Sequence, residues 1–140
     1  MFSYFANAAR VISSLKPQES TASAGAINGT AIDISGAEGP ILVTASAPVA
    51  SSGDTITFTV EHSEASGSGF VAVGADFLVD PDTGDPATFT VVTDAVAIDQ
   101  TLALKHENLK RYVRVVATTA GSGIDVFFGA WLTYFKKYAG

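Results

Sequence analysis

The sequence contains no cysteine among its 140 residues. This absence excludes disulfide bonds, thiolate zinc sites and cysteine nucleophiles, and it is compatible with assembly in a reducing cytoplasm. No uninterrupted apolar run is long enough to cross a bilayer as a helix, so we expect no membrane partner. The first 15 residues lack the basic region and apolar core of a signal peptide, and we expect them to be retained.

Positive charge is also missing from most of the chain. No Lys or Arg occurs between Pro17 and Leu104, although this segment holds 12 acidic residues. The first 16 residues carry two basic residues, and residues 105–140 carry six basic and two acidic ones. An acidic body with two basic ends indicates association with other proteins. Because it has no basic stripe interleaved with aromatic residues, we expect no nucleic-acid partner.

No residue pattern predicts catalysis or a cofactor. The two histidines, His62 and His106, have no neighbours at metal-ligand spacing, so we expect structural roles for both and no metal site. The segment Asp80-Pro-Asp-Thr-Gly-Asp85 is similar to a calcium loop, but Gly84 stands where an oxygen ligand is needed. An acidic turn is the preferred interpretation, with calcium binding as the alternative. We therefore expect that the protein is not an enzyme.

Alternating strands dominate the middle of the chain. Between Asp54 and His62, apolar side chains on one face alternate with threonines on the other, which is typical of a half-buried antiparallel strand. Turn signals, including one at 36–40, separate it from similar segments. The sequence thus predicts an all-β, jelly-roll-like β-sandwich of about eight strands over residues 25–140. The other expected strands are residues 31–34, 41–46, 70–73, 89–92, 101–105, 111–118 and 124–135.

The N-terminal segment differs from this body. Residues 2–15 space their apolar side chains near the helical period, which predicts a short helix or an extended arm that docks elsewhere. Residues 16–26 are small and polar and predict a linker. We therefore divide the chain into an N-terminal arm and linker, residues 1–24, and a β-sandwich domain, residues 25–140. The arm contributes Phe2, Tyr4, Phe5 and Arg10 as candidate contact residues.

The last predicted strand is apolar on both faces. One face carries Val126, Phe128, Ala130, Leu132 and Tyr134, and the other carries Phe127, Trp131 and Phe135. Such a strand must be covered on both sides. We expect the domain core to cover one side, and the N-terminal arm or another subunit to cover the other. Lys136 and Lys137 follow directly and join the candidate contacts.

The strand before it places Tyr112, Arg114 and Val116 on the face away from Val113 and Val115. Tyrosine and arginine are frequent at interface hot spots, so both residues are candidate contacts. Arg114 has an equally good alternative as the ion-pair partner of a neighbouring carboxylate such as Glu61. The candidate interface residues are Phe2, Tyr4, Phe5, Arg10, Tyr112, Arg114, Phe127, Trp131, Phe135, Lys136 and Lys137.

Three of these segments resemble the small cement (decoration) proteins of tailed-phage heads. The resemblance lies in Thr57-Phe-Thr-Val-Glu-His-Ser63, Phe70-Val-Ala-Val73 and Lys110-Arg-Tyr-Val-Arg-Val-Val116. It implies a jelly-roll-like subunit on the outer capsid surface, assembled in the host bacterial cytoplasm. It further implies that the subunit bridges major capsid proteins, pairs with its own copies and stabilises the shell, with no catalytic residues.

Two other functions stay open. Another phage structural subunit, from the tail tube or from head completion, would share the same composition and would assemble into rings or tubes. A carbohydrate-binding β-sandwich module would need a platform of exposed aromatic residues, and the sequence has one tryptophan, Trp131.

Overall fold

The computed structural model describes residues 9–21, 24–121 and 125–136. Within these ranges the chain forms ten strands and no helix, so the predicted all-β class is confirmed. Accordingly, the described residues include no helix with the length and apolarity needed to span a membrane. The strands are β1 (Ala9–Thr21), β2 (Gly25–Asn28), β3 (Ile32–Asp33), β4 (Ala37–Ala47), β5 (Thr55–Ser63), β6 (Val71–Ala72), β7 (Leu78–Val79), β8 (Ile98–Leu104), β9 (Tyr112–Ala120) and β10 (Asp125–Lys136).

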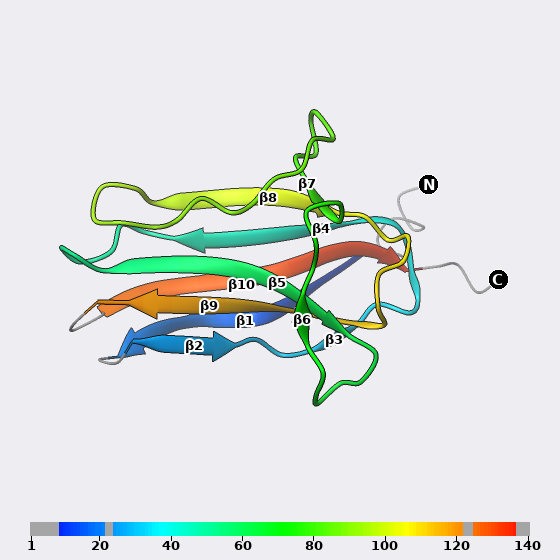
Figure 1. The fold of residues 1–140 in the computed structure, drawn as a ribbon, viewed down its shortest axis with the longest axis horizontal. Coiled ribbons are helices and arrows are strands. Elements are labelled where there is room, and N and C mark those ends of the chain that lie inside the picture. Colours follow the sequence, from blue (N-terminus) through cyan, green and yellow to red (C-terminus); the bar gives the residue numbers. More distant parts are fainter. Residues whose placement is uncertain (1–8, 22–23, 122–124, 137–140) are drawn as a thin grey trace.

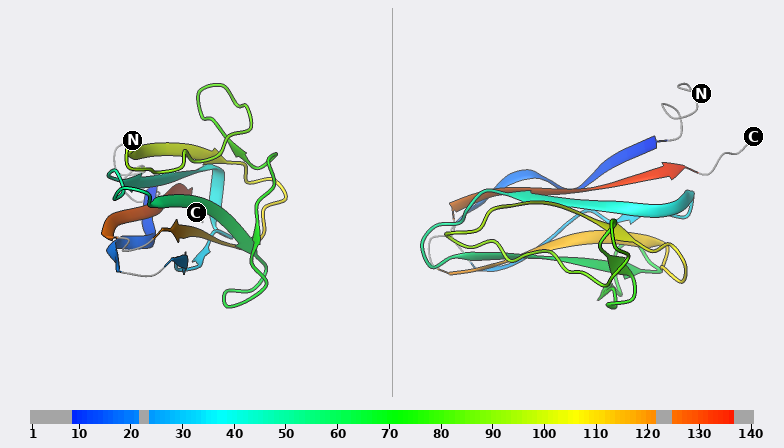
Figure 2. Two further views of the ribbon diagram at one scale, coloured as in Figure 1. Left: turned by 60° about the vertical axis from the view of Figure 1, so that its left-hand side comes forward. Right: turned by 90° about the horizontal axis from the view of Figure 1, so that it is seen from above.

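The strands form two antiparallel sheets that pack face to face as a β-sandwich (Figure 1). The first sheet has the order β1–β10–β4–β8–β7. The second has the order β2–β9–β5–β6, and β3 also pairs with β9. The first and last strands are neighbours, with Ala9 opposite Phe135, so both ends of the described chain lie at one end of the sandwich (Figure 2).

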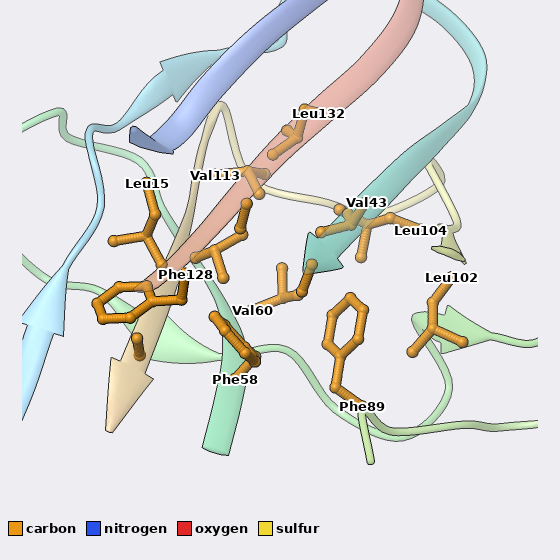
Figure 3. Packing of buried hydrophobic residues seen from close by; sticks show 14 of the residues in the cluster. Leu15, Val43, Phe58, Val60, Phe89, Leu102, Leu104, Val113, Phe128 and Leu132 are labelled. Carbon is orange, nitrogen blue, oxygen red and sulfur yellow. The ribbon is translucent and has the colours of Figure 1, made fainter. Parts of the chain in front are cut away.

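The core lies between the sheets and follows the alternation predicted for β5. Ile56, Phe58 and Val60 are buried, while the threonines between them are half-exposed. Phe58 meets Phe89 and Phe128 edge to face, with ring centroids 6.3 and 6.1 Å apart (Figure 3). Aromatic pairs favour this geometry because the positive ring edge faces the negative ring face. Truncating Phe58 to alanine would cost about 3–5 kcal/mol of stability.

For the residues that the structure describes, the segment is extended, as one of the two predicted alternatives has it, but the predicted helix and linker are wrong. Residues 9–21 form β1, which pairs with β10 in the first sheet. Leu15 is 1% exposed and belongs to the core, so the predicted boundary between residues 24 and 25 does not separate an arm from the domain. The pairing partner overrides the polar local composition, because β10 would otherwise leave an unpaired edge. Residues 1–8 of the predicted arm lie outside the described residues.

Ser14 ties β1 to the second sheet. Its hydroxyl donates to the Thr30 carbonyl at 3.0 Å and accepts the Val115 N–H at 2.8 Å. A register shift between Ser13 and Leu15 buries Ser14 and Leu15 together, which a regular alternating strand could not do. Gly29 fits beside this contact because any side chain there would collide with the Ser14 hydroxyl. The start of the domain is therefore held by buried hydrogen bonds as well as by sheet pairing.

Two further local predictions need correction. The turn predicted at 36–40 is present only at Gly36, where the Ala37 N–H donates to the Ile34 carbonyl at 2.9 Å. Residues 37–40 belong to β4, where a register shift against β10 between Thr133 and Phe135 accommodates Pro40. The strand predicted at 89–92 is irregular chain: only Val92 pairs, exchanging two backbone hydrogen bonds with Ile56 at 2.9 and 3.1 Å. The additional strands beyond the predicted eight are β1 and the short β2 and β7.

Candidate protein-interaction surface

The acidic loop at residues 80–85 is organised as a turn. The Asp80 carboxylate accepts the backbone N–H groups of Asp82 at 2.7 Å and Thr83 at 3.2 Å. The Gly84 N–H closes the turn on the Asp80 carbonyl at 2.8 Å. Across the described ranges, no three His, Asp or Glu side chains converge as metal ligands would. The acidic-turn interpretation therefore accounts for the contacts of this loop.

His62 has a structural environment. It is buried, its ring meets Phe77 edge to face at 5.5 Å, and its Nδ1 accepts the Lys110 N–H at 3.3 Å. Burial lowers the pKa of His62 because the charged ring would lose its hydration, and the nearby Lys110 charge lowers it further. His62 is therefore neutral at pH 7. His106, by contrast, is exposed at the turn before β9.

A cavity of about 380 Å³ lies beside β5, between Val60 and the segments 73–78 and 87–91. Its walls are mostly aliphatic and aromatic side chains with three threonines, and none of its lining residues is titratable in the physiological range. General acid–base catalysis needs such groups, and a threonine nucleophile needs a base beside it. The lining of this cavity supplies threonine hydroxyls but no such base.

The outer face of the second sheet is polar, and its charges are paired. Arg114 contacts Glu61 through its Nε at 2.8 Å and its Nη2 at 2.7 Å, and its guanidinium lies 4.1 Å from the centre of the Phe70 ring. The predicted ion-pair alternative for Arg114 is thus present, because Glu61 and Arg114 are directly opposite in β5 and β9. Beside it, the half-buried Tyr112 ring lies 5.3 Å from the guanidinium carbon of Arg111.

Arg111 is also engaged, in an exposed ion pair with Asp33 at 2.9 Å. The hydrogen bond from Arg111 lowers the pKa of Asp33 to about 2, assisted by the Ser35 backbone N–H. Arginine suits such positions because its planar fork holds a carboxylate while its face stacks on a ring. The two arginines of this face therefore have carboxylate partners within the chain.

The last strand divides its apolar residues as predicted. Its inner face is buried in the core, and burial raises the pKa of the Tyr134 hydroxyl. On its outer face, Phe127 is 60% exposed, Phe135 is 40% exposed and Trp131 is half-buried. The part of the prediction that assigns the inner face to the domain core is confirmed. The inner residues are Val126, Phe128, Ala130, Leu132 and Tyr134.

Neighbouring strands extend this apolar surface. Val11 of β1 and Leu42 of β4 both lie opposite Thr133 of β10, one on each side. Directly opposite residues project from the same face of a sheet. Val11 is 67% exposed and Leu42 is 37% exposed, so apolar side chains from three strands reach solvent together. We call this set the outer apolar face; it consists of Val11, Leu42, Phe127, Trp131 and Phe135.

The sequence missed Val11 and Leu42 as members of this face. Val11 lies in the segment that the sequence predicts as an arm. Leu42 is the middle residue of the apolar run Ile41-Leu-Val43, in which Ile41 and Val43 are buried. A run that is apolar on both faces indicates a central strand, and β4 is indeed central in its sheet. Which residues meet across strands depends on long-range register, which local patterns do not contain.

The predicted basic contacts lie partly at the same end of this sheet. Arg10 is opposite Tyr134, and its Nη1 donates to the Ala9 carbonyl at 2.9 Å. Lys136 is exposed at the end of β10, opposite Ala37. Phe2, Tyr4, Phe5 and Lys137 lie outside the described residues. Arg10, Lys136 and the outer apolar face thus share one end of the first sheet, with Arg10 on the inner face opposite Tyr134, whereas Tyr112 and Arg114 lie on the other sheet.

Comparison with known proteins adds no assignment, because neither a protein-family model nor a curated protein matches this sequence.

Proposed function

We propose that this protein is a structural subunit that docks its outer apolar face onto other proteins, as a cement protein on the outside of an icosahedral phage head. The observation that carries the proposal is the exposure of aromatic residues along one face of β10. Exposed apolar patches of this kind mark interaction surfaces. The sequence resemblance to phage cement proteins supplies the class of partner, a major capsid protein.

The energetics suit a repeated contact. Burying one apolar side chain contributes about 1.5–3 kcal/mol. The entropy lost on association offsets much of this gain, so a small patch alone binds weakly. On a symmetric shell, many copies and a sister subunit bind close together, and the high effective concentration strengthens the assembly. A rigid sheet loses little conformational freedom on docking, which favours this mechanism.

The basic residues at the Ala9 end of the first sheet favour a partner whose binding surface has an acidic rim. Arg10 and Lys136 lie at the Ala9 end of the first sheet, Arg10 on its inner face opposite Tyr134, and opposite charges at an interface rim guide encounter and orientation. Phe2, Tyr4, Phe5 and Lys137 lie outside the described residues and stay predicted contacts. A subunit bound in this way would bridge neighbouring capsid proteins at the outer surface of the virion, after assembly in the host cytoplasm.

A carbohydrate-binding function competes for the same aromatic residues. Phe127, Trp131 and Phe135 stand four residues apart on one face of β10, which gives the row of rings that a sugar chain would require. Their neighbours on the face include Val11 and Leu42, which offer no hydrogen bonds to sugar hydroxyls. The aliphatic neighbours favour a protein partner. A tail-tube or head-completion subunit would use the same face to form rings or tubes.

The test is sedimentation of the protein with phage heads that lack it. The double variant Phe127→Ser with Phe135→Ser should lose at least tenfold in affinity for the heads, because two apolar contacts are removed. The matched control is Val71→Ser with Val91→Ser, which changes two exposed valines that are not members of this face and should bind normally. Equal binding by both variants would contradict the proposal. Binding to a glycan array, or rings of the free protein in negative stain, would support the competing functions.

A further inference from the structure

The first strand has an open outer edge. β1 is the last strand of the first sheet, and within the described residues β10 is its only strand neighbour in that sheet. An edge strand presents backbone N–H and C=O groups to other chains, and proteins usually protect such edges with bulges, prolines or charges. The second half of β1 is protected in this way. It has two register shifts and Pro17, and the Ser14 carbonyl accepts the Thr30 N–H at 2.7 Å.

The first half of β1 has much less protection. From Ala9 to Ser13 the strand pairs with β10 without any register shift. Val11 is exposed on the outer face, and Ile12 is 36% exposed although it shares the inner face with the buried Leu132. The single charged side chain in this stretch, Arg10, turns back to its neighbour's carbonyl. A regular, apolar edge of this kind is suited to pairing with another strand.

We propose that a second copy of this chain pairs its own Ala9–Ser13 with this edge, antiparallel, about a two-fold axis at Val11. A two-fold contact requires a patch that is complementary to itself, and an antiparallel strand pair meets that requirement. The midpoint at Val11 uses all five regular residues and stops before the bulge at Ser14. It places Arg10 opposite Ile12 of the second copy, so no like charges are directly opposite.

The pairing also explains the position of the outer apolar face. Two five-stranded sheets would join through β1 into one continuous sheet, as the edge position of β1 in Figure 2 allows. Val11 of each copy would then lie at the centre of a double-width apolar surface. This inference rests on the part of the proposed function that makes a sister copy a partner. It adds which strand meets which, in what direction and in what register.

The absence of cysteine makes a disulfide test direct, because Val11→Cys carries the only thiol in the chain. Opposite residues of an antiparallel pair have Cα atoms about 4.5–5.5 Å apart, which is within disulfide reach. Under mild oxidation, Val11→Cys should form a covalent dimer at least tenfold faster than Val49→Cys, a control at another exposed valine. Ser13→Cys alone should react slowly, whereas a mixture of Ser13→Cys and Ala9→Cys should form the mixed disulfide.

Measurement of solution mass provides the second readout. The unmodified protein should be a dimer by light scattering. Ile12→Lys should be a folded monomer by circular dichroism and light scattering, because the added charge would lie directly opposite Arg10 of the second copy. Equal cross-linking rates for Val11→Cys and Val49→Cys, or a monomeric unmodified protein, would overturn the inference. If the protein fails these tests but still coats the heads, the proposed function stands and only the β1 pairing is overturned. If β1-paired dimers form but do not bind the heads, only the proposed function is overturned.

Discussion

The two outer faces of this sandwich differ in the kind of side chain that they expose to solvent. On the second sheet, Arg114 is paired with Glu61 and stacked on Phe70, and threonines occupy the alternate positions of β5. On the first sheet, Phe127 and Phe135 are exposed beside Val11 and Leu42. The same fold therefore has one face with its charged groups paired internally and one face with exposed apolar groups. The difference separates residues that stabilise the domain from residues available to a partner.

Of the two outer faces, the polar one should show the larger effect on folding. Glu61→Gln removes the counter-charge of Arg114, whose side chain is mostly buried, and should lower the free energy of unfolding by about 1–3 kcal/mol. Glu107→Gln, at an exposed position on a turn, is the control and should change it by less than about 0.5 kcal/mol. Urea denaturation measures both variants. An unaffected stability in Glu61→Gln would contradict the view that this face is held by its ion pair.

Acidification should act on the same sheet through His62. The pKa of His62 is lower in the folded protein than the ordinary value of 6.5. The folded state thus binds fewer protons than the unfolded state as the pH falls below about 6.5, and its stability declines there until the folded pKa is passed. Denaturation between pH 7.5 and 5 should show this decline, and His62→Gln should reduce its slope. An unchanged slope in His62→Gln would assign the pH dependence to other groups.

The smallest effect on folding is expected on the outer apolar face. Phe127→Ser removes a side chain that is 60% exposed, so the free energy of unfolding should change by no more than about 0.5 kcal/mol. The same variant should have less tendency to associate, because less apolar surface reaches solvent. A loss of several kcal/mol would show that Phe127 belongs to the core energetically, and the contrast between the two faces would fail.

Local sequence patterns predicted the strands whose apolar and polar side chains alternate within a single segment. The alternation from Ile56 to His62 gave β5 its inner and outer faces, and the two apolar faces of residues 126–135 predicted a strand covered on one side by the core. The possible pairing of Arg114 with Glu61 was also foreseeable, since both lie on polar faces of long strands. These features depend on side-chain periodicity within one segment.

Strand pairing between distant segments determines the features that local sequence patterns do not predict. The segment Lys16-Pro-Gln-Glu-Ser-Thr21 has the composition of a linker, yet it is a strand because β10 lies beside it. The outer apolar face likewise depends on the registers of β1 and β4 against β10, which place Val11 and Leu42 on either side of Thr133. Pro40 looked like a turn residue, but a register shift admits it into β4.

A cryo-EM structure of the phage head carrying this protein tests the central claim most directly. The proposal predicts that Phe127, Trp131 and Phe135 are buried against a capsid protein, while the threonine face of β5 stays in solvent. The opposite arrangement, with the threonine face at the shell and the outer apolar face in solvent, would contradict it.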